Sequence, residues 1–98
     1  MITIEQQIQQ AIAWMNRHAL SAGLPPERLL RQALQSRPVV DEKTGESYYW
    51  HNEESEGSEF VVGITTRENG NVIKAFYSIY PKNDLGRDHR YQGDNSFT

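Results

Sequence analysis

The sequence predicts an α+β fold in which two N-terminal helices pack on a four-stranded antiparallel sheet. Apolar residues recur at intervals of three and four over the first third of the chain, and the interval changes to two after Pro38. An Asn69-Gly70 pair then separates two alternating runs, as in a β-hairpin. At 98 residues, the chain can form one hydrophobic core but not two. We therefore expect a single domain at 1–81 followed by a polar tail at 82–98.

The first helix is predicted at residues 3–22. Its apolar stripe consists of Ile4, Ile8, Ile12, Met15 and Ala19. Thr3 and Gln6 fit a capping box at its start, and Gly23 stands where a residue with positive φ would end it.

A shorter helix is predicted after Pro25-Pro26, because a proline in the first turn of a helix has no N–H hydrogen bond to lose. Pro38 ends this helix. Its apolar face consists of Leu29, Leu30, Ala33 and Leu34. We expect the two helices to lie antiparallel and to cover one face of the sheet.

Four strands are predicted after Pro38. Val39-Val40 and residues 47–51 are β-rich runs on either side of a turn at 41–45, so they form a first hairpin. The runs at 60–67 and 72–80 flank Asn69-Gly70, and both residues of such a turn tolerate positive φ. Residues 82–98 have no apolar period, which is typical of a flexible tail.

A two-residue Asn69-Gly70 loop pairs Arg67 with Val72 and Thr65 with Lys74. One face of the hairpin is then nearly all apolar and consists of Phe60, Val62, Ile64, Thr66, Ile73, Ala75, Tyr77 and Ile79. The other face is mixed and consists of Glu59, Val61, Gly63, Thr65, Arg67, Val72, Lys74, Phe76, Ser78 and Tyr80. A shift of one residue would exchange the two faces, so the clean division favours this register.

Composition excludes several classes of protein. No apolar run approaches the about 18 residues that span a bilayer, and the first ten residues lack the pattern of a secretory signal, so we expect a cytoplasmic location and no membrane partner. Without cysteine there is no disulfide, no Cys–His zinc site and no thiol nucleophile. Motifs for nucleotide hydrolysis, dinucleotide binding, serine hydrolysis and zinc proteolysis are also absent.

The net charge of −3 is unevenly distributed along the chain. Residues 38–59 carry seven acidic residues against Lys43, whereas the segments on either side are mildly basic. Two interpretations are open. The acidic segment 41–59 is either a solvated hairpin tip and loop, or a docking surface for a basic protein partner or a mimic of nucleic acid.

The mixed face of the last hairpin is the best candidate site. It combines bases, hydroxyls and rings: Arg67, Lys74, Thr65, Ser78, Phe76 and Tyr80. Cations that pair with phosphates and flat rings on which bases stack are what binding of single-stranded nucleic acid requires. The alternative is that one helix covers Val61 and Phe76 and leaves only Lys74 to reach water.

The histidines are the candidate acid–base residues. His51 ends the aromatic run at 48–50, where it either faces a cleft or is a solvated strand end. His89 lies with Arg90 in a basic patch that either closes over a phosphate or belongs to a disordered tail. His18 falls beside the apolar stripe of the first helix and is interpreted as a boundary residue.

No metal or cofactor is expected. Two groups of residues contain potential ligands: His51 with Glu53 and Glu54, and Asp84, Asp88, His89 and Asp94. Neither spacing matches an EF-hand loop or a zinc motif.

Two segments of the last hairpin, SEFVVGI at 58–64 and ENGNVIKAFY at 68–77, resemble the corresponding hairpin of the barnase, EndoU, colicin and RelE superfamily of ribonucleases. The similarity is greatest to its phage and polymorphic-toxin branches and extends over residues 30–82. The sequence departs from the family pattern at Lys74, where the family has threonine, and at Tyr77, where it has proline.

The resemblance implies metal-independent RNA cleavage, in which the ribose 2′-OH attacks its own 3′-phosphate. It implies that His51 or His89 transfers protons and that Lys74 and Arg67 stabilise the phosphate. The implied RNA-binding residues are Thr65, Phe76, Ser78, Tyr80 and Arg90.

A non-enzymatic interaction protein is the competing function. Small size, net acidity and few catalytic candidates favour an immunity protein, an inhibitor or a phage-encoded modulator, whose acidic segment docks on a basic partner.

Overall fold

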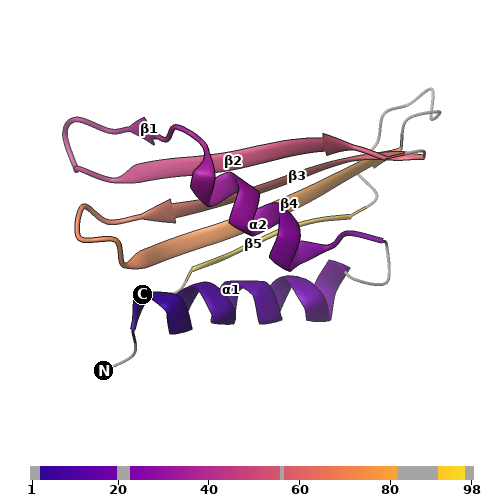
Figure 1. Ribbon diagram of the computed structural model, residues 1–98, viewed down its shortest axis with the longest axis horizontal. Helices are drawn as coiled ribbons and strands as arrows, with labels where there is room; N and C mark the ends of the chain where they lie inside the picture. Colours follow the sequence, from indigo (N-terminus) through magenta and orange to yellow (C-terminus); the bar gives the residue numbers. More distant parts are fainter. Residues whose placement is uncertain (1–2, 20–22, 56, 82–90, 97–98) are drawn as a thin grey trace.

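The described part of the chain forms two helices and an antiparallel sheet, arranged as Figure 1 shows. The computed structural model describes residues 3–19, 23–55, 57–81 and 91–96. The elements are α1 (Ile4–Ala19), α2 (Pro26–Gln35), β1 (Val39–Val40), β2 (Ser47–Glu54), β3 (Ser58–Thr66), β4 (Val72–Pro81) and β5 (Tyr91–Ser96). The strands are hydrogen-bonded in chain order, and every neighbouring pair is antiparallel. The predicted α+β fold class is confirmed.

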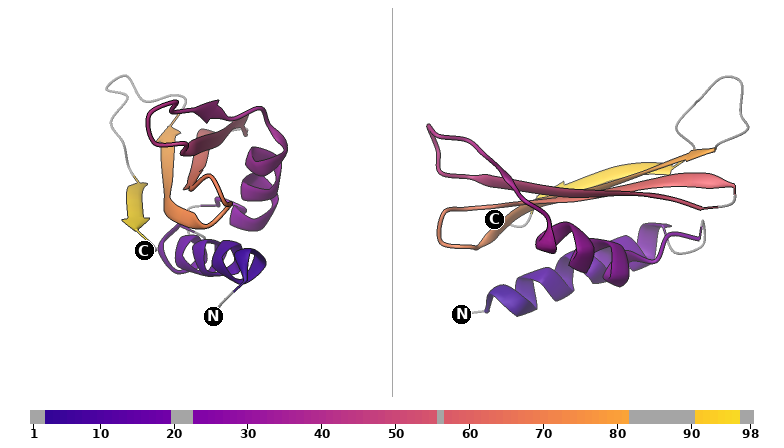
Figure 2. Two further views of the ribbon diagram at one scale, coloured as in Figure 1. Left: turned by 90° about the vertical axis from the view of Figure 1, so that its left-hand side faces the viewer. Right: turned by 45° about the horizontal axis from the view of Figure 1, so that its top comes forward.

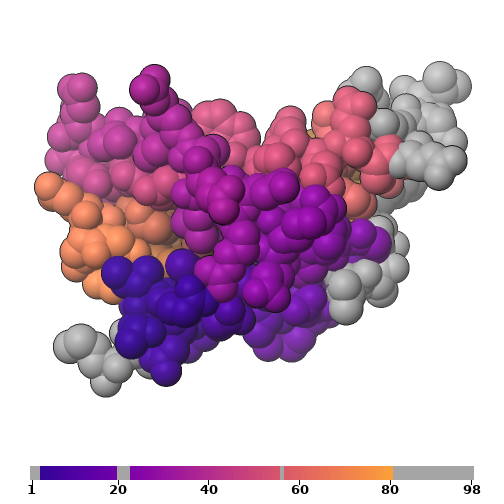
Figure 3. Space-filling view, viewed as in Figure 1, coloured from indigo at the N-terminus to yellow at the C-terminus, as the bar shows by residue number. Residues whose placement is uncertain are grey.

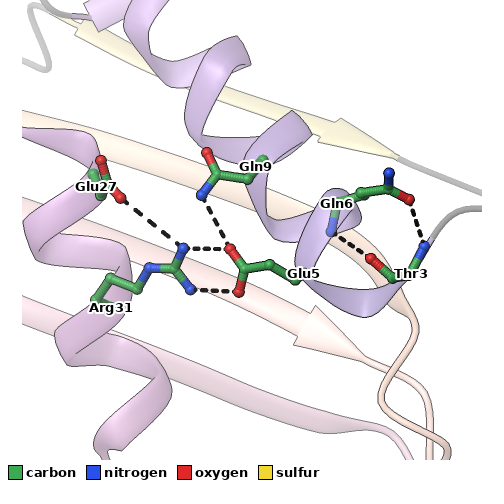
Figure 4. A network of polar contacts seen from close by, with 6 residues as sticks. All are labelled: Thr3, Glu5, Gln6, Gln9, Glu27 and Arg31. Atoms are coloured by element: carbon green, nitrogen blue, oxygen red, sulfur yellow. Dashed lines mark hydrogen bonds and ion pairs between the residues drawn. The ribbon is translucent and has the colours of Figure 1, made fainter.

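Helix α1 begins with the predicted capping box. The Thr3 hydroxyl accepts a hydrogen bond from the Gln6 N–H at 3.1 Å, and the Gln6 side-chain oxygen accepts one from the Thr3 N–H at 2.8 Å (Figure 4). Its buried face includes the predicted stripe from Ile8 onward, whereas Ile4 is 42% exposed. Gly23 has the positive φ, 92°, that the sequence predicts, but the described helix ends at Ala19 and not at the predicted residue 22.

Helix α2 begins and ends where the prolines predict. Pro26 is its first residue, where a missing N–H costs no helical hydrogen bond. The chain turns extended at Ser36, whose N–H and hydroxyl both donate to the Ala33 carbonyl. An arginine of α2, Arg31, joins the helices by donating two hydrogen bonds to the Glu5 carboxylate of α1 (Figure 4).

Both helices lie on the same face of the sheet (Figure 2). The hydrophobic core lies between the helices and the sheet. Within it, the ring centroid of Trp14 of α1 lies 5.4 Å from that of Tyr77 of β4. The sheet contributes Phe60, Val62, Ile64, Val72, Ala75, Tyr77 and Ile79 to this core. The helices cover the middle of this face, and the turns at 41–46 and 67–71 extend beyond them (Figure 3). Among the residues described, no helix is long and apolar enough to span a bilayer.

The β3–β4 turn differs from the prediction. Gly70 donates its N–H to the Arg67 carbonyl and has a φ of 93°, and Arg67 donates its N–H to the Asn71 carbonyl. The loop therefore has three residues, 68–70, and not the predicted two. Gly70 closes it in a left-handed conformation. Thr66 pairs with Val72 as a result, and the predicted pairing of Arg67 with Val72 is wrong.

A bulge at Ile73 compensates for the longer loop. The β3–β4 register shifts by one residue between Thr65 and Thr66. From the Thr65–Lys74 pair to the end of the hairpin away from the turn, the pairing is the predicted one. Val72 is consequently buried in the core, and Ile73 is only half-buried, the reverse of the prediction. The Val72 N–H donates to the Gln7 side-chain oxygen of α1 at 2.6 Å, which satisfies the backbone beside the bulge.

Strand β5 adds a fifth strand to the four that the sequence predicts. It pairs with β4 from Ile79–Tyr91 to Lys74–Ser96, and it lies within the segment predicted to be a polar tail. Backbone pairing at a sheet edge does not require an apolar period, which explains why the sequence pattern does not reveal it. Residues 82–90 and 97–98 of the predicted tail lie outside the described residues.

Candidate functional site

The face of the sheet turned away from the helices is the candidate site (Figure 2). We call it the open face. Strand alternation and the observed register assign to it the side chains of Val39, Tyr48, Trp50, Asn52, Glu54, Glu59, Val61, Thr65, Lys74, Phe76, Ser78 and Tyr80, together with Gly63. Val61 and Phe76 alternate along their strands with the residues that form the core, so they face away from α1 and α2, and the alternative arrangement considered from the sequence does not occur.

Three rings form an aromatic cluster on the open face: Tyr48, Trp50 and Phe76. The Tyr48 ring centroid lies 5.3 Å from that of Trp50 and 5.8 Å from that of Phe76, and the Tyr48–Phe76 pair is stacked. Trp50 is 41% exposed, whereas Trp14 in the core is 7% exposed. A phenol is protonated at neutral pH, and burial raises the pKa of the Tyr48 phenol further above its ordinary value. The cluster therefore presents flat apolar surface and a neutral hydroxyl to the solvent side of the sheet.

The cations of the open face lie at one end of this cluster. Lys74 is exposed and pairs with Thr65, which in turn pairs with Tyr48 on β2. Arg67 is exposed just beyond the end of β3. It lines a hollow of about 410 Å³ between the two hairpin turns, together with Thr44, Glu46, Glu68 and Asn69. Lys74 and Thr65 thus lie toward one end of the open face, and Arg67 lies beyond that end, beside a hollow that Glu46 and Glu68 also line.

Ser78 and Tyr80 are less accessible than the sequence suggests. Ser78 is on the open face but is only 5% exposed, so its hydroxyl is not presented to a ligand. Tyr80 is half-buried and pairs with Glu59 toward the opposite end from Lys74.

His51 lies on the helix-covered side of the sheet. Its Nε2 is 3.5 Å from Glu53 Oε1, and Glu53 accepts two hydrogen bonds from Arg28 of α2. Those hydrogen bonds from Arg28 are the main reason that the pKa of the Glu53 carboxyl lies below its ordinary value, with His51 adding to the effect. Nε2 is itself buried, and none of the described groups forms a hydrogen bond with it.

The structure therefore separates the predicted acid–base residue from the predicted cations. His51 pairs with Val62 of β3, and Lys74 pairs with Thr65 of the same strand. Val62 and Thr65 are three residues apart and face opposite sides of the sheet, so His51 and Lys74 do too. His89 and Arg90 lie outside the described residues.

The ligand set considered around His51 is also divided. Glu53 shares the side of His51, and Glu54 is on the open face. Within the described part of the chain, no group of three or more His, Cys, Asp or Glu side chains is placed to hold a metal ion.

Sequence reasoning missed Tyr48, Trp50 and Gly63 as parts of the site. Gly63 is buried beneath the Phe76 ring and makes room for it. The signal that reveals all three is the pairing of β2 with β3, which brings Trp50, Gly63 and Phe76 into one cross-strand row.

The acidic segment 41–59 is continuous in the sequence but not in space. Asp41, Glu42 and Glu46 flank the β1–β2 turn, whereas Glu53, Glu54 and Glu59 lie toward the other end of β2 and β3. The seven steps from Ser47 to Glu54 span about 23 Å of extended strand. The segment therefore does not form one acidic surface.

No protein-family model matches the chain, and no curated protein or solved structure is significantly similar to it.

Proposed function

We propose that the protein binds single-stranded RNA on the open face of its sheet. The observation that carries the proposal is the aromatic cluster of Tyr48, Trp50 and Phe76 beside the exposed Lys74, on a face that neither helix covers. Bases stack on flat rings and phosphates pair with cations, and one stacked base typically contributes about 1–3 kcal/mol.

The exposure of Trp50 supports a ligand-binding role for the cluster. Large aromatic side chains are usually well covered in a folded protein, and an exposed one within a ring-lined surface is typical of an interaction site. Tyr48 packs against Trp50 and holds it in place, so that the outer surface of the indole is available to a base. The resemblance of residues 58–77 to a ribonuclease hairpin favours RNA as the polyanion.

Binding is the part of the ribonuclease hypothesis that the geometry supports. Cleavage also requires a proton donor and a proton acceptor beside the bound phosphate. The histidine expected to fill one of these roles, His51, is directed to the other side of the sheet. We therefore propose RNA binding, and RNA cleavage is a separate outcome to be measured.

Docking of a basic protein on residues 41–59 has less support. The acidic residues are divided between two ends of the sheet, and Glu53 is already paired with Arg28. A basic protein that binds the acidic residues of this segment would have to contact both ends of the sheet at once.

The test is a titration of fluorescein-labelled 12-nucleotide RNA by fluorescence anisotropy. Trp50→Ala should weaken binding by about tenfold, the equivalent of one lost stacking contact. Lys74→Gln should weaken it several-fold and reduce the salt dependence by about one phosphate contact, because the lysine no longer displaces a counterion. Arg17→Gln removes an exposed arginine from α1 on the other side of the molecule and is the matched control.

Equal affinities for the wild type and all three variants would overturn the proposal. Circular dichroism of each variant separates lost binding from lost fold. Incubation of the same RNA in EDTA measures cleavage: fragments that end in a cyclic phosphate, and that are lost in His51→Ala or His89→Ala, would show an enzyme.

A further inference from the structure

The β3–β4 loop contains the single Asn-Gly pair of the sequence. Asn69 is exposed in this loop, and its side-chain Oδ1 accepts a hydrogen bond from the Asn71 N–H at 3.0 Å. A side chain that bonds to the backbone two residues ahead must fold forward over the residue between them. The carbonyl carbon of the Asn69 side chain, Cγ, is therefore held close to the backbone nitrogen of Gly70.

This arrangement favours attack of the Gly70 nitrogen on the Asn69 side chain. The Asn71 N–H donates to Oδ1, the atom on which negative charge develops when a nucleophile adds to Cγ. Gly70 has no side chain that shields its nitrogen, whereas Asn71 is followed by the branched Val72. The exposure of Asn69 admits the water that the reaction consumes.

One hydrogen bond opposes the reaction. The Gly70 N–H donates to the Arg67 carbonyl at 2.9 Å, and the nitrogen attacks only after it has lost this proton. The loop is a short hairpin tip in which Arg67, Glu68 and Asn69 are exposed, so its local opening costs much less than unfolding of the protein. The hydrogen bond therefore slows the reaction without preventing it.

We propose that Asn69 is a site of spontaneous deamidation in the folded protein. Hydroxide removes the Gly70 amide proton, and the nitrogen forms a bond to Asn69 Cγ. The Cγ–Nδ2 bond breaks, and ammonia leaves with a proton taken from water, which gives a five-membered succinimide. Water then opens the ring: hydrolysis at Cγ yields aspartate, and hydrolysis at the Asn69 backbone carbonyl yields isoaspartate. This inference is independent of RNA binding.

Deamidation changes the hollow between the two hairpin turns. Asn69 lines this hollow with Arg67, Glu46 and Glu68, so the product places a third carboxylate beside the arginine. Isoaspartate also inserts one carbon atom into the backbone of the loop, which displaces the Gly70 N–H from the Arg67 carbonyl. The β3–β4 turn is therefore less stable in the isoaspartate form.

The test is incubation of the protein at neutral and at alkaline pH, followed by tryptic digestion and mass spectrometry. Cleavage after Arg67 and Lys74 releases a peptide, residues 68–74, that contains both Asn69 and Asn71. We expect the amide NH₂ to be replaced by OH at Asn69 at least tenfold faster than at Asn71. The rate should rise with pH, and isoaspartate should be present, because direct hydrolysis of the amide yields only aspartate. A sample digested without incubation corrects for deamidation during digestion.

Asn52 is the matched control within the protein, because it is also exposed but is followed by Glu53. Gly70→Ala should slow deamidation of Asn69 at least tenfold. That variant strains the turn, since Gly70 has a φ of 93° and an added Cβ would lie 2.9 Å from Ile4 Cδ1. The variant and the wild type are therefore also compared in urea, where the turn is absent and the alanine side chain alone slows the reaction.

The isoaspartate form, separated by anion exchange, should melt at a lower temperature than Asn69→Asp, which has the same charge and an ordinary backbone. Equal melting temperatures would overturn the proposed effect on the turn. An Asn69 that stays intact in the folded protein, while it converts in urea, would show that the hydrogen bond from Gly70 to Arg67 protects it and would overturn the proposal. Equal rates at Asn69 and Asn52 would overturn it as well.

Discussion

The ring of Phe76 lies directly over Gly63 on the neighbouring strand. A Cβ atom added to Gly63 would be 2.0 Å from Phe76 Cε1, far closer than two carbon atoms can approach. Gly63 is therefore required for space, since its backbone conformation is ordinary extended strand. The glycine allows Phe76 to reach across β3 and stack on Tyr48 of β2.

We predict that Gly63→Ala destabilises the protein by about 1–3 kcal/mol, the usual cost of forcing extra atoms into a packed position. The Phe76 ring must move away from Tyr48, so RNA affinity should fall as well. Urea denaturation measures the first effect and anisotropy the second.

Gly57→Ala is the control, because nothing lies within 4 Å of a Cβ at that position. It should change the free energy of unfolding by less than about 0.5 kcal/mol. A Gly63→Ala protein as stable as Gly57→Ala would show that Phe76 moves without cost.

Elements with local signals were predicted well from the sequence. The capping box of Thr3 and Gln6 is contained within one turn of helix. From the Thr65–Lys74 pair outward, the β3–β4 register follows from alternation on both strands. The loop length was not predictable in this way, because the extra loop residue and the bulge at Ile73 cancel and leave the outer pattern unchanged.

The part of the site on the β3–β4 hairpin was predicted from the sequence, and the part contributed by β2 was missed. Lys74, Thr65 and Phe76 share the β3–β4 hairpin, and their common face follows from alternation. The β2 strand reads SYYWHNEE, with aromatic residues on both faces, so its sequence does not show which side faces the helices. Only the pairing with β3 assigns Trp50 to the open face and His51 to the covered one.

Trp50 should report RNA binding through its fluorescence. Trp50 is 41% exposed and Trp14 is 7% exposed, so iodide should quench mainly Trp50. Stacking of a base on the indole should lower the emission and protect it from iodide. We expect RNA to reduce iodide quenching in the wild type and to have no effect in Trp50→Phe, whose remaining indole is in the core. Equal protection in both proteins would place the RNA elsewhere.

Gln7 should contribute to stability through the backbone of β4. Its side-chain oxygen accepts the hydrogen bond of the Val72 N–H at 2.6 Å, and its amide donates to the Asn71 side chain at 2.9 Å. Gln7→Ala leaves a partly buried N–H without this partner, at an expected cost of about 1–3 kcal/mol. Gln10→Ala, an exposed position on the same helix, should be nearly neutral in the same denaturation experiment. A Gln7→Ala protein as stable as Gln10→Ala would mean that water replaces the hydrogen bond.

The ion pair between Glu5 and Arg31 should make the helix pair sensitive to acid. Hydrogen bonds from Arg31 and then from Gln9 lower the pKa of Glu5 from the usual 4.5 to about 2 (Figure 4). A carboxyl with a lowered pKa binds fewer protons in the folded state than in the unfolded state. Its contribution to stability is therefore complete above about pH 4.5 and is lost as the pH falls toward 2.

We predict that Glu5→Gln lowers the melting temperature at pH 7 and makes it less dependent on pH between 4.5 and 2 than in the wild type. The effect at pH 7 should be small and should shrink in high salt, because the pair is exposed to solvent. Glu42→Gln removes an exposed carboxylate from the β1–β2 turn, and its melting curve should follow the wild type through the same range. Parallel pH profiles for Glu5→Gln and the wild type would show that Arg31 does not hold Glu5 ionised in solution, and the two helices would then be joined by their apolar contacts alone.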